Sequence, residues 1–148
     1  MSGDEQPIGV DTVMRAVRLF AGVTAESVAE LDDVVTLPQL RVLVLASSTP
    51  GLSNSAVAEE LDVHLSNATR ICDRLVQAGL LSRREAPTDR RRVELRLTAA
   101  GEALVEAVTA HRRATVGRIL RRMTTDEQQS LAAALERLLE AAEEGREH

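Results

Sequence analysis

Residues 65–97 contain two hydrophobic periods in direct succession, and this succession restricts the fold more than any other feature of the chain. In residues 65–78, apolar side chains recur at the i, i+3, i+4, i+7 spacing of a helix with one buried face: Ala68, Ile71, Cys72 and Leu75. Gly79 follows in the position that commonly ends a helix. In residues 92–97, apolar and charged side chains alternate with the period of a half-buried strand: Val93, Leu95 and Leu97 on one face. We therefore expect a one-faced helix followed by a β-hairpin.

The segment before this helix predicts two shorter helices. One runs from about Pro38 to Ala46, with Thr36 or Leu37 near its cap, and the Pro-Gly pair in residues 47–51 breaks it. Ser53 then caps a short helix that ends before the turn at residues 62–64. Short helices joined by a tight turn to a polar-faced helix predict a helix-turn-helix. Strands at residues 80–85 and 92–97, joined by a loop that contains Pro87, would form a wing beside it.

The flanking segments have helical spacing. Residues 8–33 form one such segment, Thr98 is placed to cap a long helix, and Thr124 and Glu127 have capping-box spacing at the start of a last helix. The last helix carries a long apolar face: Leu131, Leu135, Leu138, Leu139 and Ala142. A small domain does not cover a face of this length, so we expect packing against a partner chain.

These patterns predict a mainly α fold with a small β-hairpin wing, in a chain of 148 residues that is long enough for one full core. We expect a single domain over residues 1–148. Within it, residues 37–98 would form a winged helix-turn-helix lobe, and residues 8–33 and 101–146 would form dimerisation helices.

The net charge of −5 conceals an uneven distribution along the chain. Residues 1–33 and 126–148 each carry seven acids and two arginines, whereas residues 34–125 carry fourteen arginines and nine acids. The local field, and not the net charge, governs attraction to phosphate. The middle of the chain is therefore suited to a polyanion, while the acidic flanks limit indiscriminate adhesion.

Several classes of function are disfavoured. The three histidines are scattered and the single cysteine, Cys72, has no cysteine partner, so no metal-ligand spacing is present and no intrachain disulfide can form. The chain contains neither a glycine-rich phosphate loop nor a nucleophile elbow, which argues against an enzyme and against a cofactor. No apolar run approaches membrane-spanning length and the N-terminus is not a signal peptide, so we expect a cytoplasmic protein without a membrane partner.

The stretch from Leu37 to Gly101 resembles the MarR/SlyA family of winged-helix transcriptional regulators. The resemblance is carried by residues at fixed intervals: Leu37, Gln39, Leu43, Val57, Ala58, Leu61, Thr69, Arg70, Asp73, Arg74, Leu75, Gly79, Leu80, Arg83, Asp89, Arg90, Arg91, Leu97, Thr98 and Gly101. Three positions depart from the family pattern: Leu40, where an aromatic residue is common, His64, where serine is usual, and Leu65, where a basic residue is frequent.

The resemblance implies a homodimer that binds double-stranded DNA at a pseudo-palindromic operator and represses transcription. It also implies a small-molecule effector, bound between the dimer region and the DNA-binding lobe. The residues that we expect to contact DNA lie on the outward face of the 65–78 helix and on the hairpin: Leu65, Ser66, Asn67, Thr69, Arg70, Arg74, Arg83, Arg90 and Arg91.

Different roles are expected within this set. Asn67, Thr69 and Arg70 would face base edges in the major groove, while Leu65 offers only apolar contact. Arg90 and Arg91 would enter a minor groove, although Arg91 is equally suited to pair with Asp89 or Asp73 and brace the wing. Arg83, Arg84 and Arg96 are better placed for phosphate contacts or as surface charges of the strands.

Two alternatives to a ligand-responsive repressor stay open at this point. Cys72 could sense oxidants, but its place on the inward stripe favours an inert core thiol. The second alternative is a winged helix that binds only proteins. The arginines of the wing argue against it.

Overall fold

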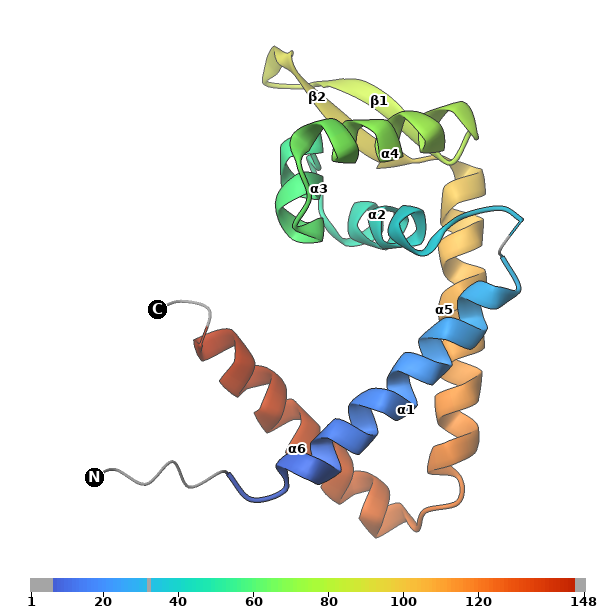
Figure 1. The fold of residues 1–148 in the computed structure, drawn as a ribbon, viewed down its shortest axis with the longest axis vertical. Coiled ribbons are helices and arrows are strands. Elements are labelled where there is room, and N and C mark those ends of the chain that lie inside the picture. The colour runs from blue at the N-terminus through green and yellow to red at the C-terminus, as the bar shows by residue number, and fades with distance from the viewer. Residues whose placement is uncertain (1–6, 32, 146–148) are drawn as a thin grey trace. The chain divides into compact units, whose positions relative to one another are not determined.

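The computed structural model describes residues 7–31 and 33–145, and within them the chain forms six helices and two strands (Figure 1). Their order is α1 (Val10–Ala29), α2 (Leu37–Ser48), α3 (Asn54–Leu61), α4 (Leu65–Gln77), β1 (Leu81–Ala86), β2 (Asp89–Leu97), α5 (Ala99–Leu120) and α6 (Thr125–Glu144). This confirms the predicted fold class. The chain divides into two compact units, residues 1–112 and 113–148, and α5 begins in the first and ends in the second.

Local signals set the start of α2 and α3. The Thr36 hydroxyl accepts a hydrogen bond from the backbone N–H of Gln39, whose side chain accepts one from the Thr36 N–H in return. This capping box satisfies two backbone donors that would otherwise have no partner. At α3 the Ser53 hydroxyl accepts from the Ala56 N–H at 3.1 Å. Both caps agree with the sequence prediction.

Asp62 makes the turn between α3 and α4. Its backbone adopts the left-handed conformation, with φ 53° and ψ 51°, and it is the non-glycine residue with positive φ among those described. Aspartate tolerates this region better than most residues because its short side chain can bond locally. The turn separates α3 from α4 by only two further residues, Val63 and His64.

The core of the first unit lies between α2, α3, α4 and the hairpin. Its fully buried large side chains come from all of these elements: Leu40, Val42, Leu43, Leu52, Val57, Cys72, Leu75, Leu81 and Leu95. Removing a side chain of this size from water stabilises a fold by roughly 1.5–3 kcal/mol. The helix-turn-helix and the wing therefore share a single core.

The hairpin packs on this core with its regularly paired half, and its pairing becomes irregular toward the tip. Antiparallel pairing runs from Leu81 opposite Leu97 to Glu85 opposite Val93, after which the register shifts so that Ala86 pairs with Asp89. Leu52 adds an isolated bridge to Leu95, whose N–H donates to the Leu52 carbonyl at 2.8 Å. The buried end of the hairpin is thus held on two sides.

Two expectations for the hairpin were wrong in detail. β2 begins at Asp89 and not at Arg92, because pairing continues to the two-residue turn at Pro87 and Thr88. Val93 is 48% exposed, although it shares the apolar alternation of Leu95 and Leu97. It lies beyond the part of the hairpin that the core covers, so alternation there no longer indicates burial.

Thr98 joins the hairpin to α5. Its hydroxyl donates to the Gly79 carbonyl at 2.5 Å and accepts from the Gly101 N–H at 3.1 Å, as expected of a cap. Its own N–H donates to the Leu80 carbonyl at 3.2 Å. Gly101 lies directly against this carbonyl, and a side chain at this position would collide with backbone. The end of α4 and the start of α5 are therefore closely joined.

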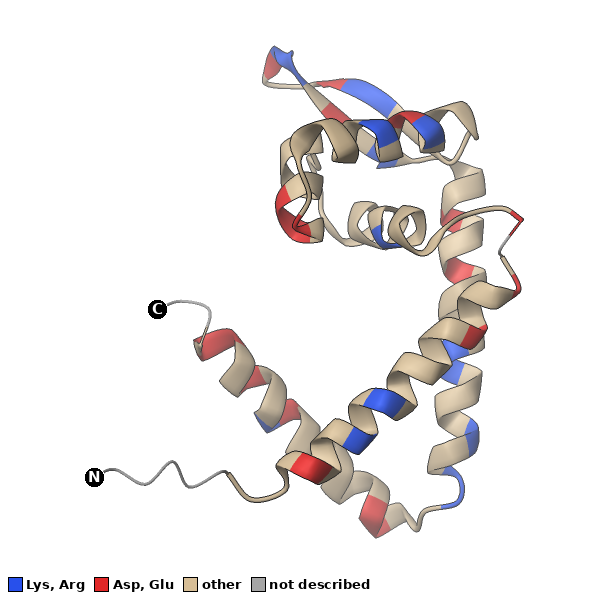
Figure 2. Cartoon of the chain, viewed as in Figure 1, with Lys and Arg blue, Asp and Glu red and all other residues tan. Residues whose placement is uncertain are grey.

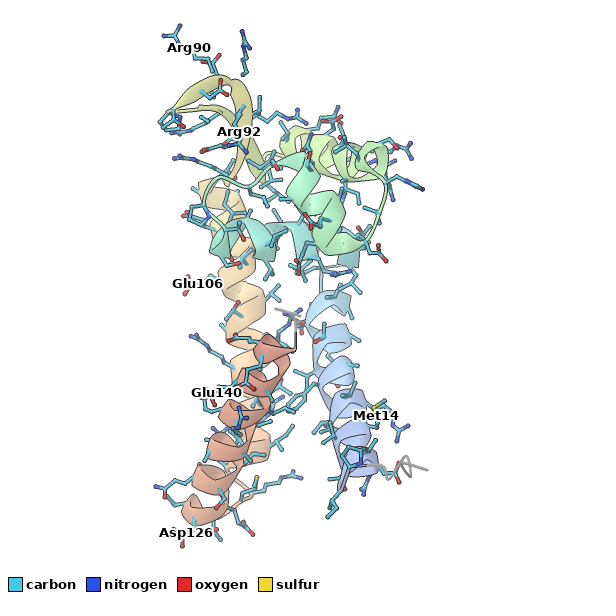
Figure 3. All side chains as sticks on the ribbon, turned by 90° about the vertical axis from the view of Figure 1, so that its left-hand side faces the viewer. Met14, Arg90, Arg92, Glu106, Asp126 and Glu140 are labelled. Carbon is cyan, nitrogen blue, oxygen red and sulfur yellow. The ribbon has the colours of Figure 1, made fainter. Side chains whose placement is uncertain are left out.

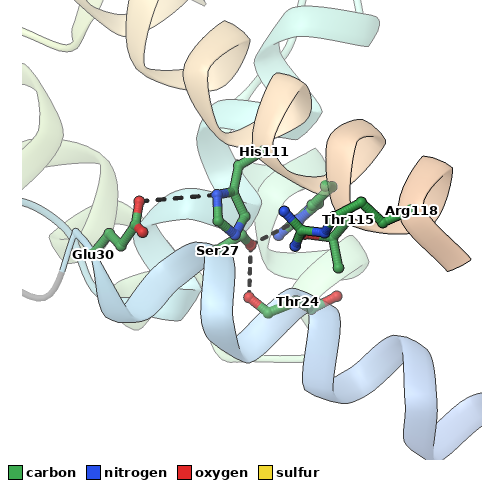
Figure 4. A network of polar contacts seen from close by, with 7 residues as sticks. Thr24, Ser27, Glu30, His111, Thr115 and Arg118 are labelled. Atoms are coloured by element: carbon green, nitrogen blue, oxygen red, sulfur yellow. Dashed lines mark hydrogen bonds and ion pairs between the residues drawn. The ribbon is translucent and has the colours of Figure 1, made fainter.

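The C-terminal end of α1 packs inward, with Val23, Ser27 and Val28 buried. A short polar network lies here (Figure 4): the Ser27 hydroxyl donates to the Thr24 carbonyl at 2.7 Å and accepts from Nε of Arg112 at 3.0 Å. His111 Nδ1 lies 4.0 Å from a carboxylate oxygen of Glu30 in the same network. The Ser27–Arg112 bond and the contact between His111 and Glu30 link the end of α1 to α5 within the first unit.

In the second unit, the turn into α6 is closed by side chains. Thr124 and Glu127 form the predicted capping box, with bonds of 2.8 and 3.2 Å. Gln128 Nε2 donates to the carbonyls of Leu120 and Met123. None of the residues of α6 is buried, and Leu138 and Leu139 are 50% and 59% exposed.

Candidate nucleic-acid interface

Helix α4 separates its apolar and polar residues almost completely. Ala68, Cys72 and Leu75 are buried, and Ile71 packs against them. The opposite face is solvent-exposed or half-buried, and it holds every residue of α4 that the sequence singled out: Leu65, Ser66, Asn67, Thr69, Arg70 and Arg74. The first turns of the helix therefore present amide, hydroxyl and guanidinium groups together, with the apolar Leu65 at the N-terminus.

The hairpin adds a second cationic surface to the same lobe. Arg90, Arg91 and Arg92 are exposed and lie in the irregular half of β2, between the pairs Glu85–Val93 and Ala86–Asp89. The Asp89 carboxylate accepts from the Arg91 N–H at 2.9 Å and so orders this end. Arg90 extends beyond the ribbon at the tip of the hairpin (Figure 3).

Ion pairs decide which arginines carry uncompensated charge. Nη2 of Arg83 pairs with Oδ1 of Asp73, which joins β1 to α4. The brace between wing and helix is therefore made by Arg83 and not by Arg90 or Arg91. Arg96 pairs with Glu94 at 3.3 Å along β2, so this arginine is a surface charge of the strand.

Thr69 is connected to α3. Nδ2 of Asn54 donates to its hydroxyl oxygen at 3.4 Å, across the helix-turn-helix. The hydroxyl proton of Thr69 stays available for a further acceptor, because the bond from Asn54 uses only an oxygen lone pair. Oδ1 of Asn54 is buried and has no hydrogen-bond partner among the described residues. Asn54 carries no distinctive signal in the sequence, since a polar residue after a capping serine is ordinary.

The Cys72 thiol lies in the core beneath this surface. Burial raises its pKa to about 11. The charge of Asp73 also raises the pKa, whereas the charge of Arg83 lowers it. A thiol with such a pKa is protonated at neutral pH, and the thiolate is the reactive form. Both burial and protonation therefore oppose a role in sensing oxidants.

A cavity of about 500 Å³ opens beside α2, within the first unit. Its lining is largely apolar with two arginines and one glutamate: Thr24, Leu37, Leu40, Arg41, Val44, Leu45, Ser48, Glu60, Leu61 and Arg112. The family resemblance implied an effector between the dimer region and the DNA-binding lobe. It gave no indication of Glu60 or Arg112.

The charge distribution follows the sequence pattern. Basic residues lie on α4 and along the hairpin, whereas acidic residues predominate on α6 (Figure 2). Across residues 7–31 and 33–145 no group of three or more histidine, cysteine or acidic side chains is arranged to hold a metal ion. Among the described helices none is long and apolar enough to cross a membrane.

Comparison with known proteins agrees with this geometry. The model of the MarR family matches residues 35–93, which span α2, α3, α4 and the hairpin up to Val93. The transcriptional repressor MdtR of Bacillus subtilis is 34% identical over 126 residues, a match that covers 84% of this chain and 81% of MdtR. The chain belongs to the MarR family.

Solved structures extend the MarR likeness beyond the lobe. The crystal structure of RV1404 from Mycobacterium tuberculosis has a TM-score of 0.80 and 36% identity, and the match covers 93% of this chain and 95% of RV1404. The M. tuberculosis MarR family protein RV2887, solved in complex with salicylic acid, has a TM-score of 0.66 and 28% identity over 91% of this chain and 98% of RV2887. MdtR is an HTH-type transcriptional repressor, and the related YfiV of B. subtilis is described as an HTH-type transcriptional regulator.

Proposed function

We propose that this MarR chain is a transcriptional repressor that binds operator DNA as a homodimer and releases it when a small molecule binds. The observation that carries the proposal is the outer face of α4. It exposes Asn67, Arg70 and Arg74 while the opposite face is buried, and the arginine-rich hairpin belongs to the same core.

Base selectivity would come from the first turns of α4. Arg70 can form two parallel bonds to a guanine, Asn67 can bond an adenine, and Leu65 can touch a thymine methyl group. The Thr69 hydroxyl, held by Asn54, would donate to a phosphate or a base acceptor. Each good bidentate contact discriminates between bases by about 1–3 kcal/mol.

The hairpin would supply affinity. Arg90 and Arg91 would enter the minor groove next to the bound major groove, where a narrow A·T-rich stretch concentrates negative potential. Contacts of this kind hold the protein in register on the duplex and respond to groove width.

Fluorescence anisotropy on a duplex selected from a random pool would test this surface. We expect Arg70→Ala to weaken binding to the selected duplex strongly and to a random duplex only slightly. Arg90→Ala should weaken both and make the salt dependence shallower, by about 0.9 in the logarithmic slope for each lost phosphate contact. Arg137→Ala removes the same charge from α6, which belongs to neither the helix-turn-helix nor the hairpin, and should leave binding unchanged. Unchanged affinity in both Arg70→Ala and Arg90→Ala would refute the proposed interface.

Dimerisation is inferred from two apolar faces. The N-terminal half of α1 exposes Val13, Met14, Val17 and Phe20, and α6 exposes Leu135, Leu138 and Leu139. Exposed apolar side chains that recur on one face of a helix are typical of interaction sites. One lobe also makes too few contacts for useful selectivity, whereas two lobes about one helical turn apart match a pseudo-palindrome. Sedimentation equilibrium should give a dimer at micromolar concentration, and a monomer there would contradict this part of the proposal.

The cavity beside α2 is the proposed effector site. Its apolar lining would surround a small hydrophobic body, and Arg41 and Arg112 would attract a carboxylate. The structure of the relative RV2887 with salicylic acid supports a ligand of this chemistry. We expect salicylate to lower DNA affinity in the anisotropy assay and Arg41→Gln to shift its effect to higher concentrations. A salicylate titration without effect on either protein would contradict binding of salicylate in this cavity.

A further inference from the structure

Asp73 is the acidic residue of α4, and its carboxylate belongs to the DNA-facing side of the lobe. It follows Arg70 by three residues and immediately precedes Arg74, yet its ion-pair partner is Arg83 on the neighbouring strand β1. The pair is half-exposed, with 37% of the Arg83 side chain and 46% of the Asp73 side chain accessible. Both charges therefore lie where a bound polyanion could reach them.

The pair removes one cation from the binding surface. Arg83 lies between α4 and the arginines of the hairpin tip, so without a partner it would be a good phosphate ligand. With Asp73 in contact, its charge is neutralised and its guanidinium is turned toward the helix. A half-exposed ion pair contributes little to fold stability, so its larger effect falls on what the surface binds.

We propose that Asp73 is a specificity-determining residue, which keeps Arg83 from contacting DNA phosphates and so holds down affinity for arbitrary sequence. This inference rests on the proposed function of α4 and the hairpin as the DNA-binding surface. A freed Arg83 would add a phosphate contact on any sequence, but it would also release β1 from α4, whose position sets the contacts to base edges, so random DNA should gain more affinity than the operator. Asp73 thus acts by removing a phosphate contact, while Asn67 and Arg70 act by contacting bases.

The test compares four proteins on two DNA probes. The proteins are wild type, Asp73→Asn, Arg83→Gln and the double variant, and the probes are a random-sequence duplex and the selected duplex. Asn has nearly the shape of Asp, so the fold is retained while the charge is lost. Glu106→Gln is the matched control, because it removes one exposed negative charge from α5, outside the helix-turn-helix and the hairpin. Urea unfolding of each variant checks that all are folded.

For Asp73→Asn we expect several-fold tighter binding to the random duplex. Its logarithmic salt dependence should steepen by about 0.9 for each new phosphate contact, or roughly twice that in a dimer. Binding to the selected duplex should gain less, because the freed Arg83 no longer holds β1 against α4, so the specificity ratio falls. Arg83→Gln alone should keep the wild-type slope, and the double variant should return to it.

Three results would overturn the inference. The first is an unchanged salt slope in Asp73→Asn, and the second is an equal change of slope in Glu106→Gln. The third is a shallower slope in Arg83→Gln alone, because it would mean that Arg83 already contacts phosphate in the presence of Asp73. Failure of the proposed function is a separate result: wild type would then bind neither duplex in a salt-dependent manner.

Discussion

Replacing Gly101 with alanine should destabilise the protein, although alanine is the better helix former. Gly101 lies in the first turn of α5, where the substitution gains up to about 1 kcal/mol of helix propensity. Against this gain, a Cβ there would collide with the Leu80 carbonyl oxygen and lie 3.1 Å from Cδ2 of Leu97. Overpacking against groups that cannot move away costs about 1–3 kcal/mol.

A second cost comes from the Leu80 carbonyl itself. It accepts the hydrogen bond from the Thr98 N–H, so displacing it weakens a bond that contributes about 0.5–1.5 kcal/mol. The balance predicts a loss of roughly 1–3 kcal/mol in the free energy of unfolding. Loosening of the joint between the hairpin and α5 should accompany it.

Gly22→Ala is the matched control for this prediction. Gly22 lies in α1, and a Cβ there would meet no atom within 4 Å, so only the gain in helix propensity should remain, about 0.5–1 kcal/mol. Urea unfolding followed by circular dichroism, at one fixed protein concentration, would measure both variants, with sedimentation confirming the same oligomeric state. If Gly101→Ala were as stable as Gly22→Ala, the close contact with Leu80 would not exist in solution.

Three further predictions concern other parts of the chain. Burial raises the pKa of Cys72 to about 11 in the folded protein, above the ordinary value of 9.0, so its contribution to stability is present below pH 9 and is lost as the pH rises through 11. Lysine and tyrosine are absent from the sequence, so a thermal melting series from pH 9 to 11 isolates this group, and a flat profile would contradict the burial. Thr124→Ala removes the capping box of α6 and should cost about 1 kcal/mol, measured by urea unfolding against Thr125→Ala as the control. Leu138→Glu should lower the dimer affinity in sedimentation without loss of helicity, and an unchanged dimer would exclude this face of α6.

Much of the lobe could be predicted from the sequence because its signals are local. Thr36, Ser53 and Gly79 act on backbone groups within a few residues, and the stripe on α4 has a single period over its whole length. Such signals need no knowledge of the tertiary fold. The starts of these helices were therefore predicted to within about a residue, whereas α2 ends at Ser48 and not at Ala46.

The parts that escaped prediction depend on contacts between distant residues. The sequence suggested Arg91 as a partner for Asp73, but the structure pairs Asp73 with Arg83, because the answer depends on how β1 lies against α4. The exposure of Val93 depends on where the core ends, and the bond from Asn54 to Thr69 depends on how α3 crosses α4. The roles of the predicted DNA contacts and of the dimerisation helices stay predictions.

The single hydroxyl of Thr98 has a mechanical consequence. Through its bonds to Gly79 and Gly101 it connects the residues that end α4 to the first turn of α5. A tilt imposed on the start of α5 is therefore transmitted to the end of α4 without being absorbed in a linker. The winged lobe is attached to the start of α5 through Thr98, so a small rotation of this part of α5 produces a larger displacement at the tip of the hairpin.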